Sequence, residues 1–185
     1  MTIVALAISS SAAWSQPVTK VKIAELACHR VERLVLLKKI DASFSKQLER
    51  IDVIEAKQGN VAFQAMVSQT QPENGQPIQL QLAFDVDGKP ISFQLVAGGT
   101  AGPDPKWPGQ NSVSLTENSL HYVLDHANDA KIKNFYDGFT FMVLSAGNVD
   151  GTAVSRAQLQ SSLTTDKMNI YLNLDGTFHS AEFVQ

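Results

Sequence analysis

The sequence predicts an α+β protein made of two tandem repeats, each with one or more helices followed by a four-stranded antiparallel meander. Three observations support this fold class. The chain matches itself at an offset of 88 residues, alternating apolar runs flank an Asp-Gly turn in both copies, and helical periodicity precedes each set of strands.

The internal match aligns residues 35–97 with residues 123–185 without a gap, and twelve aligned positions are identical. Gly-Asn-Val and Asp-Gly recur among them, and such turn residues fix strand register. Chance gives no reason for both turns to recur at one spacing. We therefore expect repeats at residues 16–97 and 111–185, joined by a Gly/Pro-rich linker at residues 98–110.

The first residues resemble an export signal. Residues 1–15 carry no charge, and the small residues Ala13 and Ser15 suit signal-peptidase cleavage before Gln16. Cys28 is the only cysteine, so no intrachain disulfide can form, which favours a bacterial periplasmic or secreted location. No segment has the apolar length of a membrane span.

Helices are expected at the start of each repeat. Apolar residues recur at helical spacing over residues 23–35, and residues 116–119 offer caps for a helix that continues through Leu124. Short second helices are expected at residues 41–48 and 129–136, each capped by its initial Asp.

Each repeat should then form two hairpins. The first pairs residues 51–57 with 61–69, and in the second copy residues 139–145 with 152–160. Its turn in the second copy is either Gly147-Asn148 or Asp150-Gly151.

The last hairpins are predicted to turn through two residues, Asp87-Gly88 and Asp175-Gly176. That turn sets the expected cross-strand partners. They are Phe84 with Ile91, Leu82 with Phe93 and Leu80 with Leu95, then Leu172 with His179, Ile170 with Ala181 and Met168 with Phe183.

The segments 51–57, 61–67 and 84–91 (Phe-Asp-Val-Asp-Gly-Lys-Pro-Ile) resemble the PepSY and cystatin-like group of α+β4 domains. Two such units in one exported chain are similar in architecture to β-lactamase inhibitory proteins. The resemblance implies an inhibitory or protein-binding module. Residues 58–62 depart from the Gln-x-Val-x-Gly hairpin of cystatins, and the paired cysteines of the β-lactamase inhibitors are absent, so neither specific activity is implied.

No established catalytic motif occurs in the chain, and we expect no catalytic residues, no metal and no cofactor. Cys28 is expected to be a buried structural residue. His121 and Asp125 share a helix face but lack further zinc ligands nearby in sequence. A hydrolase that uses His121, Asp125 or His179 is the least favoured alternative.

Three aromatic residues are the candidate partner-binding residues. Trp107 lies between two prolines, where it either anchors a partner or packs between the repeats. Tyr171 and Phe178 are predicted on the polar face of the second sheet.

The charges of the two repeats differ. Residues 16–97 hold ten Lys/Arg against nine Asp/Glu, net +1, whereas residues 111–185 hold four against eight, net −4. The chain has no basic patch that would indicate a nucleic-acid partner. A partner with a basic surface would be attracted to the second repeat. The sequence therefore favours an exported, non-enzymatic module that binds or inhibits a protein, such as a secreted enzyme or envelope protein. A carrier of a small ligand is the alternative.

Overall fold

The computed structural model describes residues 17–105, 107 and 111–185. The predicted signal peptide, residues 1–15, lies outside this described part. The helices are α1 (Lys20–Leu36), α2 (Ser43–Gln47), α3 (Ser112–Asp125) and α4 (Ala130–Gly138). The strands are β1 (Leu48–Gln58), β2 (Val61–Gln69), β3 (Gln76–Pro77), β4 (Gln79–Phe84), β5 (Pro90–Leu95), β6 (Gly99–Thr100), β7 (Phe139–Val149), β8 (Thr152–Ser161), β9 (Lys167–Leu172) and β10 (Phe178–Val184).

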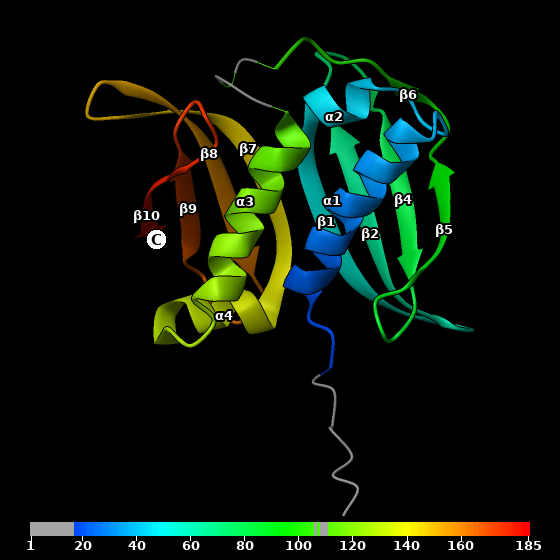
Figure 1. Cartoon of the computed structure of the whole chain (residues 1–185), viewed down its shortest axis with the longest axis horizontal. Coiled ribbons are helices and arrows are strands. Elements are labelled where there is room, and N and C mark those ends of the chain that lie inside the picture. Colours follow the sequence, from blue (N-terminus) through cyan, green and yellow to red (C-terminus); the bar gives the residue numbers. More distant parts are fainter. Residues whose placement is uncertain (1–16, 106, 108–110) are drawn as a thin grey trace, which may run out of the picture.

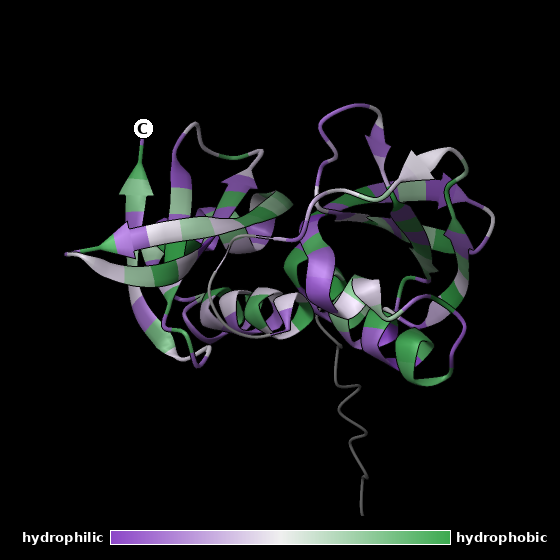
Figure 2. Cartoon of the chain, turned by 90° about the horizontal axis from the view of Figure 1, so that it is seen from above, coloured by the Kyte–Doolittle hydropathy of each residue, from purple (hydrophilic) through white to green (hydrophobic). Residues whose placement is uncertain are grey.

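Eight of these strands form one antiparallel sheet in the order β10-β9-β8-β7-β1-β2-β4-β5, and the helices cover one of its faces (Figure 1). The predicted α+β class is confirmed. Seen from above, the helices form one layer and the strands the other (Figure 2). Buried residues of both halves form a single hydrophobic cluster between the layers.

The first strands of the two halves, β1 and β7, lie side by side at the centre of the sheet. The pairs are Arg50 with Val143, Ile51 with Met142 and Asp52 with Phe141. The guanidinium of Arg50 lies 4.0 Å from the centroid of the Phe141 ring across this join. The two predicted units are therefore parts of one continuous sheet.

Side-chain caps mark the start of α1, α3 and α4, whereas α2 begins after Ala42, which has no capping side chain, and not after Asp41 as expected. Thr19 accepts a hydrogen bond from the backbone N–H of Lys22 at the start of α1, and Asp129 caps α4 as expected. The helix α3 begins earlier than predicted, because Asn111 rather than residues 116–119 caps it by accepting from the backbone N–H of Val113. Among the described residues no helix is long and apolar enough to cross a bilayer.

The last hairpin of each half has a three-residue loop, so the predicted two-residue turn is wrong. Asp85 and Lys89 close the first loop, and Asn173 and Thr177 close the second. Gly88 and Gly176 adopt left-handed φ values of 77° and 83°, as expected of a type I turn followed by a glycine bulge.

The extra loop residue shifts the register by one only at the pair next to each loop, because a bulge in β5 and another in β10 restore the predicted register beyond it. Phe84 lies opposite Pro90 instead of Ile91, and Leu172 lies opposite Phe178 instead of His179. The other four predicted pairs are confirmed: Leu82 with Phe93, Leu80 with Leu95, Ile170 with Ala181 and Met168 with Phe183.

The first hairpins follow a different offset. Their closing pairs are Gln58 with Val61 and Val149 with Thr152, which lie 91 positions apart, and the second turn is Asp150-Gly151. Gly147 and Asn148 lie within β7. The offset returns to 88 at the last hairpin because the β2–β4 connection, residues 70–78, is longer than the β8–β9 connection, residues 162–166.

The described part of the predicted linker contacts the first half. Gly99–Thr100 pairs in parallel with Gln76–Pro77 as β6 with β3. Beyond the linker, the Ser112 hydroxyl donates to the carbonyl of Ser45 and accepts from the backbone N–H of Leu48. These bonds fasten the start of α3 to the first half.

Candidate functional site

Each half has a groove between its long helix and the loop of its last hairpin. In the second half this α3 groove has a volume of about 500 Å³. It is lined by Asn118, His121, Tyr122, Asp125, His126, Leu172, Asp175, Gly176, Thr177 and Phe178. The Asn118 side-chain amide donates a hydrogen bond, 3.0 Å long, to the carbonyl of Gly176, which joins α3 to the loop of the last hairpin.

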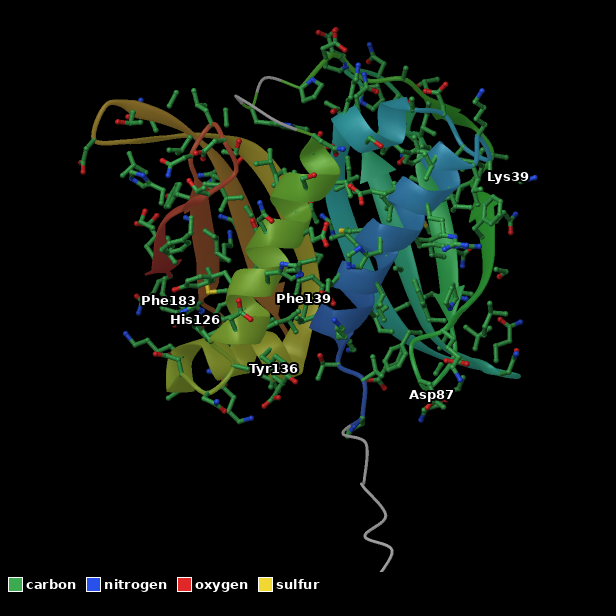
Figure 3. The ribbon with its side chains drawn as sticks, viewed as in Figure 1. Lys39, Asp87, His126, Tyr136, Phe139 and Phe183 are labelled. Carbon is green, nitrogen blue, oxygen red and sulfur yellow. The ribbon has the colours of Figure 1, made fainter. Side chains whose placement is uncertain are left out.

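A row of stacked rings forms one wall of the α3 groove. The rings of Tyr122 and Phe178 are almost parallel, 6° apart, with centroids separated by 4.6 Å. Tyr122 also stacks on His126, at 4.4 Å. His126 lies at the end of α3 nearest α4 (Figure 3). Phe178 remains 48% exposed, so part of this aromatic surface faces solvent.

Two carboxylates, Asp125 and Asp175, also line the α3 groove. Hydrogen bonds from the Thr177 hydroxyl and backbone N–H hold the pKa of Asp175 below its ordinary value, so this group is ionised at neutral pH. In the described part of the chain, no Lys or Arg pairs with either carboxylate. The α3 groove therefore combines an exposed ring with uncompensated negative charge.

The corresponding α1 groove of the first half has a volume of about 390 Å³ and the opposite charge. It is lined by Leu26, His29, Arg30, Arg33, Phe84, Gly88 and Pro90. Its helix residues correspond to those of the α3 groove at an offset of 92, so that Arg30 takes the place of Tyr122 and Arg33 that of Asp125. Pro90 takes the place of Phe178 at an offset of 88.

Between the two grooves, α1 and α3 exchange Glu–His contacts. His121 Nε2 lies 2.9 Å from Glu25 Oε1, and His29 Nε2 lies 3.2 Å from Glu117 Oε1. Burial acts to raise the pKa of Glu25, but hydrogen bonds from Lys22 and His121 outweigh it and leave the pKa below its ordinary value. We call these four residues the helix seam.

The three predicted partner-binding residues lie apart in the structure. Trp107 is half-buried and packs against the core. Phe178 lies on the helix side of the sheet, where it stacks on Tyr122. The one-residue register shift separates it from Tyr171, whose hydroxyl donates to Glu182 on the other face. The prediction that Tyr171 and Phe178 share a face is therefore wrong.

The hydrolase candidates are also held by separate partners. His121 contacts Glu25, whereas His179 Nδ1 lies 3.1 Å from the side-chain oxygen of Asn173. Cys28 is fully buried, and this burial raises the pKa of its thiol well above the ordinary value, as expected of a structural cysteine.

Sequence reasoning missed Tyr122 and the helix seam. A usable signal was present: Glu-Leu-Ala-Cys-His at residues 25–29 and Glu-Asn-Ser-Leu-His at 117–121 repeat a Glu-x-x-x-His pattern. The two copies of the pattern lie 92 positions apart. A gap-free alignment at an offset of 88 therefore does not align them. Tyr122 becomes a candidate only when the loop geometry places Phe178 against α3.

No protein-family model matches the chain, and no curated protein sequence is similar to it. Two solved structures show a distant likeness. A protein described as a lipoprotein from Clostridium difficile 630 has a TM-score of 0.28 and 8% identity, with 84% of this chain and 90% of that chain covered. The YpeB C-terminal domain of Bacillus megaterium has a TM-score of 0.25 and 15% identity, with 87% and 65% covered. At these TM-scores neither structure supports an argument about function, so the function proposed below is argued from the grooves.

Proposed function

We propose that this chain is an exported, non-catalytic module that binds a protein partner, and that its α3 groove holds a basic side chain of that partner. One observation carries the proposal: the exposed Phe178 ring, stacked on Tyr122, lies in the same groove as the uncompensated carboxylates Asp125 and Asp175.

The chemistry of the groove favours a cation. A Lys or Arg side chain on an aromatic face gains about 0.5–2 kcal/mol, and adjacent carboxylates add to that attraction. The second half also carries a net negative charge, four Lys/Arg against eight Asp/Glu over residues 111–185, whereas the first half is close to neutral, and this difference would steer a basic surface toward the second half. A protein that binds and inhibits a secreted enzyme would fit the same description.

A small organic cation is the second candidate. The groove volume of about 500 Å³ lies within the range of ligand pockets, roughly 300–1,000 Å³. A carrier and a protein-binding module would share the recognition of a positive charge on an aromatic ring, but they differ in what the charge is attached to.

Fluorescence anisotropy with a labelled Lys/Arg-rich peptide tests the proposal, with a Glu-rich peptide of equal length as the negative probe. We expect the basic peptide to bind and the acidic peptide not to bind. Phe178→Ala should weaken binding about tenfold, since it removes the exposed ring. Asp125→Asn should weaken binding and reduce its dependence on salt.

Matched controls come from the first half. Asp87 lies in the β4–β5 loop on the other side of the molecule from His126 (Figure 3), so Asp87→Asn should leave binding unchanged. Leu36→Ala removes another exposed apolar side chain at a distance from the groove. Equal loss in Phe178→Ala and Leu36→Ala would reject the α3 groove as the site. If free arginine or choline displaces the labelled peptide more strongly than the unlabelled peptide does, the small-ligand carrier is favoured.

Trp107 and Tyr171 remain predicted partner contacts, and the same assay extends to them. Tyr171→Ala should weaken binding without a large change in melting temperature if Tyr171 touches the partner. Because Trp107 packs against the core, Trp107→Ala should lower the melting temperature as well. Normal binding by both variants would remove them from the interface.

A further inference from the structure

The helix seam and its neighbour Glu32 bring metal-ligating side chains of both halves together. His29 and Glu32 lie one turn apart on α1, and Glu117 faces them from α3. One ligand atom from each of the three lies within 4.8 Å of the other two. This arrangement is independent of the α3 groove, because none of the three residues lines it.

The spacing of these atoms suits a small divalent cation. Bonds of about 2.0–2.2 Å in tetrahedral geometry place adjacent ligand atoms roughly 3.4 Å apart. His29 Nε2 and Glu117 Oε1 are already 3.2 Å apart. A carboxylate at up to 4.8 Å can close the remaining gap by rotation of the Glu32 side chain.

The surroundings combine three carboxylates with an open coordination position, and the cation Arg33 lies in the same hollow as His29 and Glu32. Three carboxylates lie here, those of Glu25 and Glu117 within the helix seam and that of Glu32 beside it, and among the described residues Lys22 forms an ion pair with Glu25 alone. His29 and Glu32 also line an open hollow of about 630 Å³ beside Ser45 and Asn111, which gives water access to the ligands. His121, 3.9 Å from Glu117 Oε1 and held by Glu25, is placed to orient that carboxylate.

We propose that His29, Glu32 and Glu117 bind a first-row divalent cation such as Zn²⁺, with water in the fourth position. The imidazole nitrogen and two carboxylate oxygens are ligands that zinc accepts. A bound ion would connect α1 of the first half to α3 of the second and would replace the direct contact between His29 and Glu117.

Isothermal titration of the metal-stripped, tag-free chain with ZnSO₄ at pH 7 tests this site. We expect one ion per chain and a rise in melting temperature on binding. Glu32→Gln is the sharpest variant, because Glu32 forms no ion pair within the described residues and its loss leaves the seam contacts intact. It should weaken zinc binding by about tenfold or more, as should His29→Gln.

His179→Gln is the matched control, since His179 belongs neither to the α3 groove nor to the trio and its Nδ1 lies beside the side chain of Asn173. Its zinc affinity should stay within about twofold of the parent chain, while folding of every variant is checked by circular dichroism. Absence of zinc binding by the parent chain would overturn the proposal. So would unchanged zinc binding in both Glu32→Gln and His29→Gln.

Discussion

The α1 and α3 grooves occupy the same place in the two halves and have opposite chemistry. Both lie between a long helix and a three-residue loop that ends in a left-handed glycine. The α1 groove presents Arg30 and Arg33, whereas the α3 groove presents Tyr122 and Asp125 at the corresponding positions. The backbone geometry is retained while the ligand preference is carried by a few side chains. A binding surface can therefore change its charge without any change of fold.

The largest expected effects concern the core beneath each groove. Phe84 and Leu172 are equivalent, fully buried residues opposite the first paired residue of each edge strand. Phe84→Ala should lower the free energy of unfolding by about 3–5 kcal/mol and Leu172→Ala by about 2–5 kcal/mol. Urea denaturation followed by circular dichroism measures both. Because one core spans the halves, each variant should unfold in a single transition. Two separated transitions would show that the halves unfold independently.

The loop glycines should give the next largest effects. Gly88→Ala and Gly176→Ala each place a side chain in the left-handed region, which costs about 1–2 kcal/mol. A Cβ at Gly88 would also come within 2.8 Å of the Leu26 side chain, against 3.2 Å from that of Asn118 at Gly176. We therefore expect thermal denaturation to show the larger loss for Gly88→Ala. Unchanged melting temperatures would contradict the shared loop geometry.

The corresponding residues Arg30 and Tyr122 should differ modestly. Tyr122→Ala removes two ring stacks, each worth about 0.5–1.5 kcal/mol, in addition to buried area. Arg30→Ala removes one cation–π contact with Phe93 at 6.0 Å, worth roughly 0.5–1 kcal/mol. The difference between their melting temperatures measures how much of the α3 groove is preorganised by stacking. Equal losses would mean that the two ring stacks of Tyr122 add no more to stability than the single cation–π contact of Arg30.

The smallest effect is a pH dependence at the helix seam. The pKa of Glu25 is lowered in the folded chain, so its stabilising contribution is present above the unfolded-state pKa, near 4.3, and is lost as the pH falls through the folded value. The parent chain should melt above Glu25→Gln at pH 6–7, and the gap should narrow below about pH 4. Melting curves across this range check it. A gap that is constant with pH would show that Glu25 acts through packing alone.

Much of the fold follows from local sequence patterns. Alternating apolar residues placed β4 and β9, and the Asp-Gly pairs located both last hairpins, because these signals depend on neighbours in the chain. The count of loop residues was missed, since Asp-Gly fits a two-residue turn and also the end of a three-residue loop. Because the loop is one residue longer than expected, Phe178 lies on the helix side of the sheet instead of on the opposite face.

The candidate sites depend on contacts between distant segments, which composition and spacing do not reveal. The α3 groove required the packing of Tyr122 against Phe178, 56 positions apart. Prediction of the helix seam would have required knowing that α1 and α3 lie side by side. That contact accompanies the pairing of β1 with β7, which joins the two halves. The charge difference between the halves was visible in the sequence, but the groove that concentrates it was not.

The central strand pairing has a consequence for association of the chain with itself. Ile51 and Met142 face each other at the join and lie 91 positions apart, the same separation as the closing residues Gln58 and Val149 of the two first hairpins. Ile51 meets its own counterpart, while Arg50 pairs with the counterpart of Asp52 and Asp52 with that of Arg50, as in the self-complementary contact of a twofold homodimer. A polypeptide with only one half would leave that strand edge unpaired and open to self-association. In this chain the second half pairs with that edge through β7, so the edge lies at the centre of one continuous sheet.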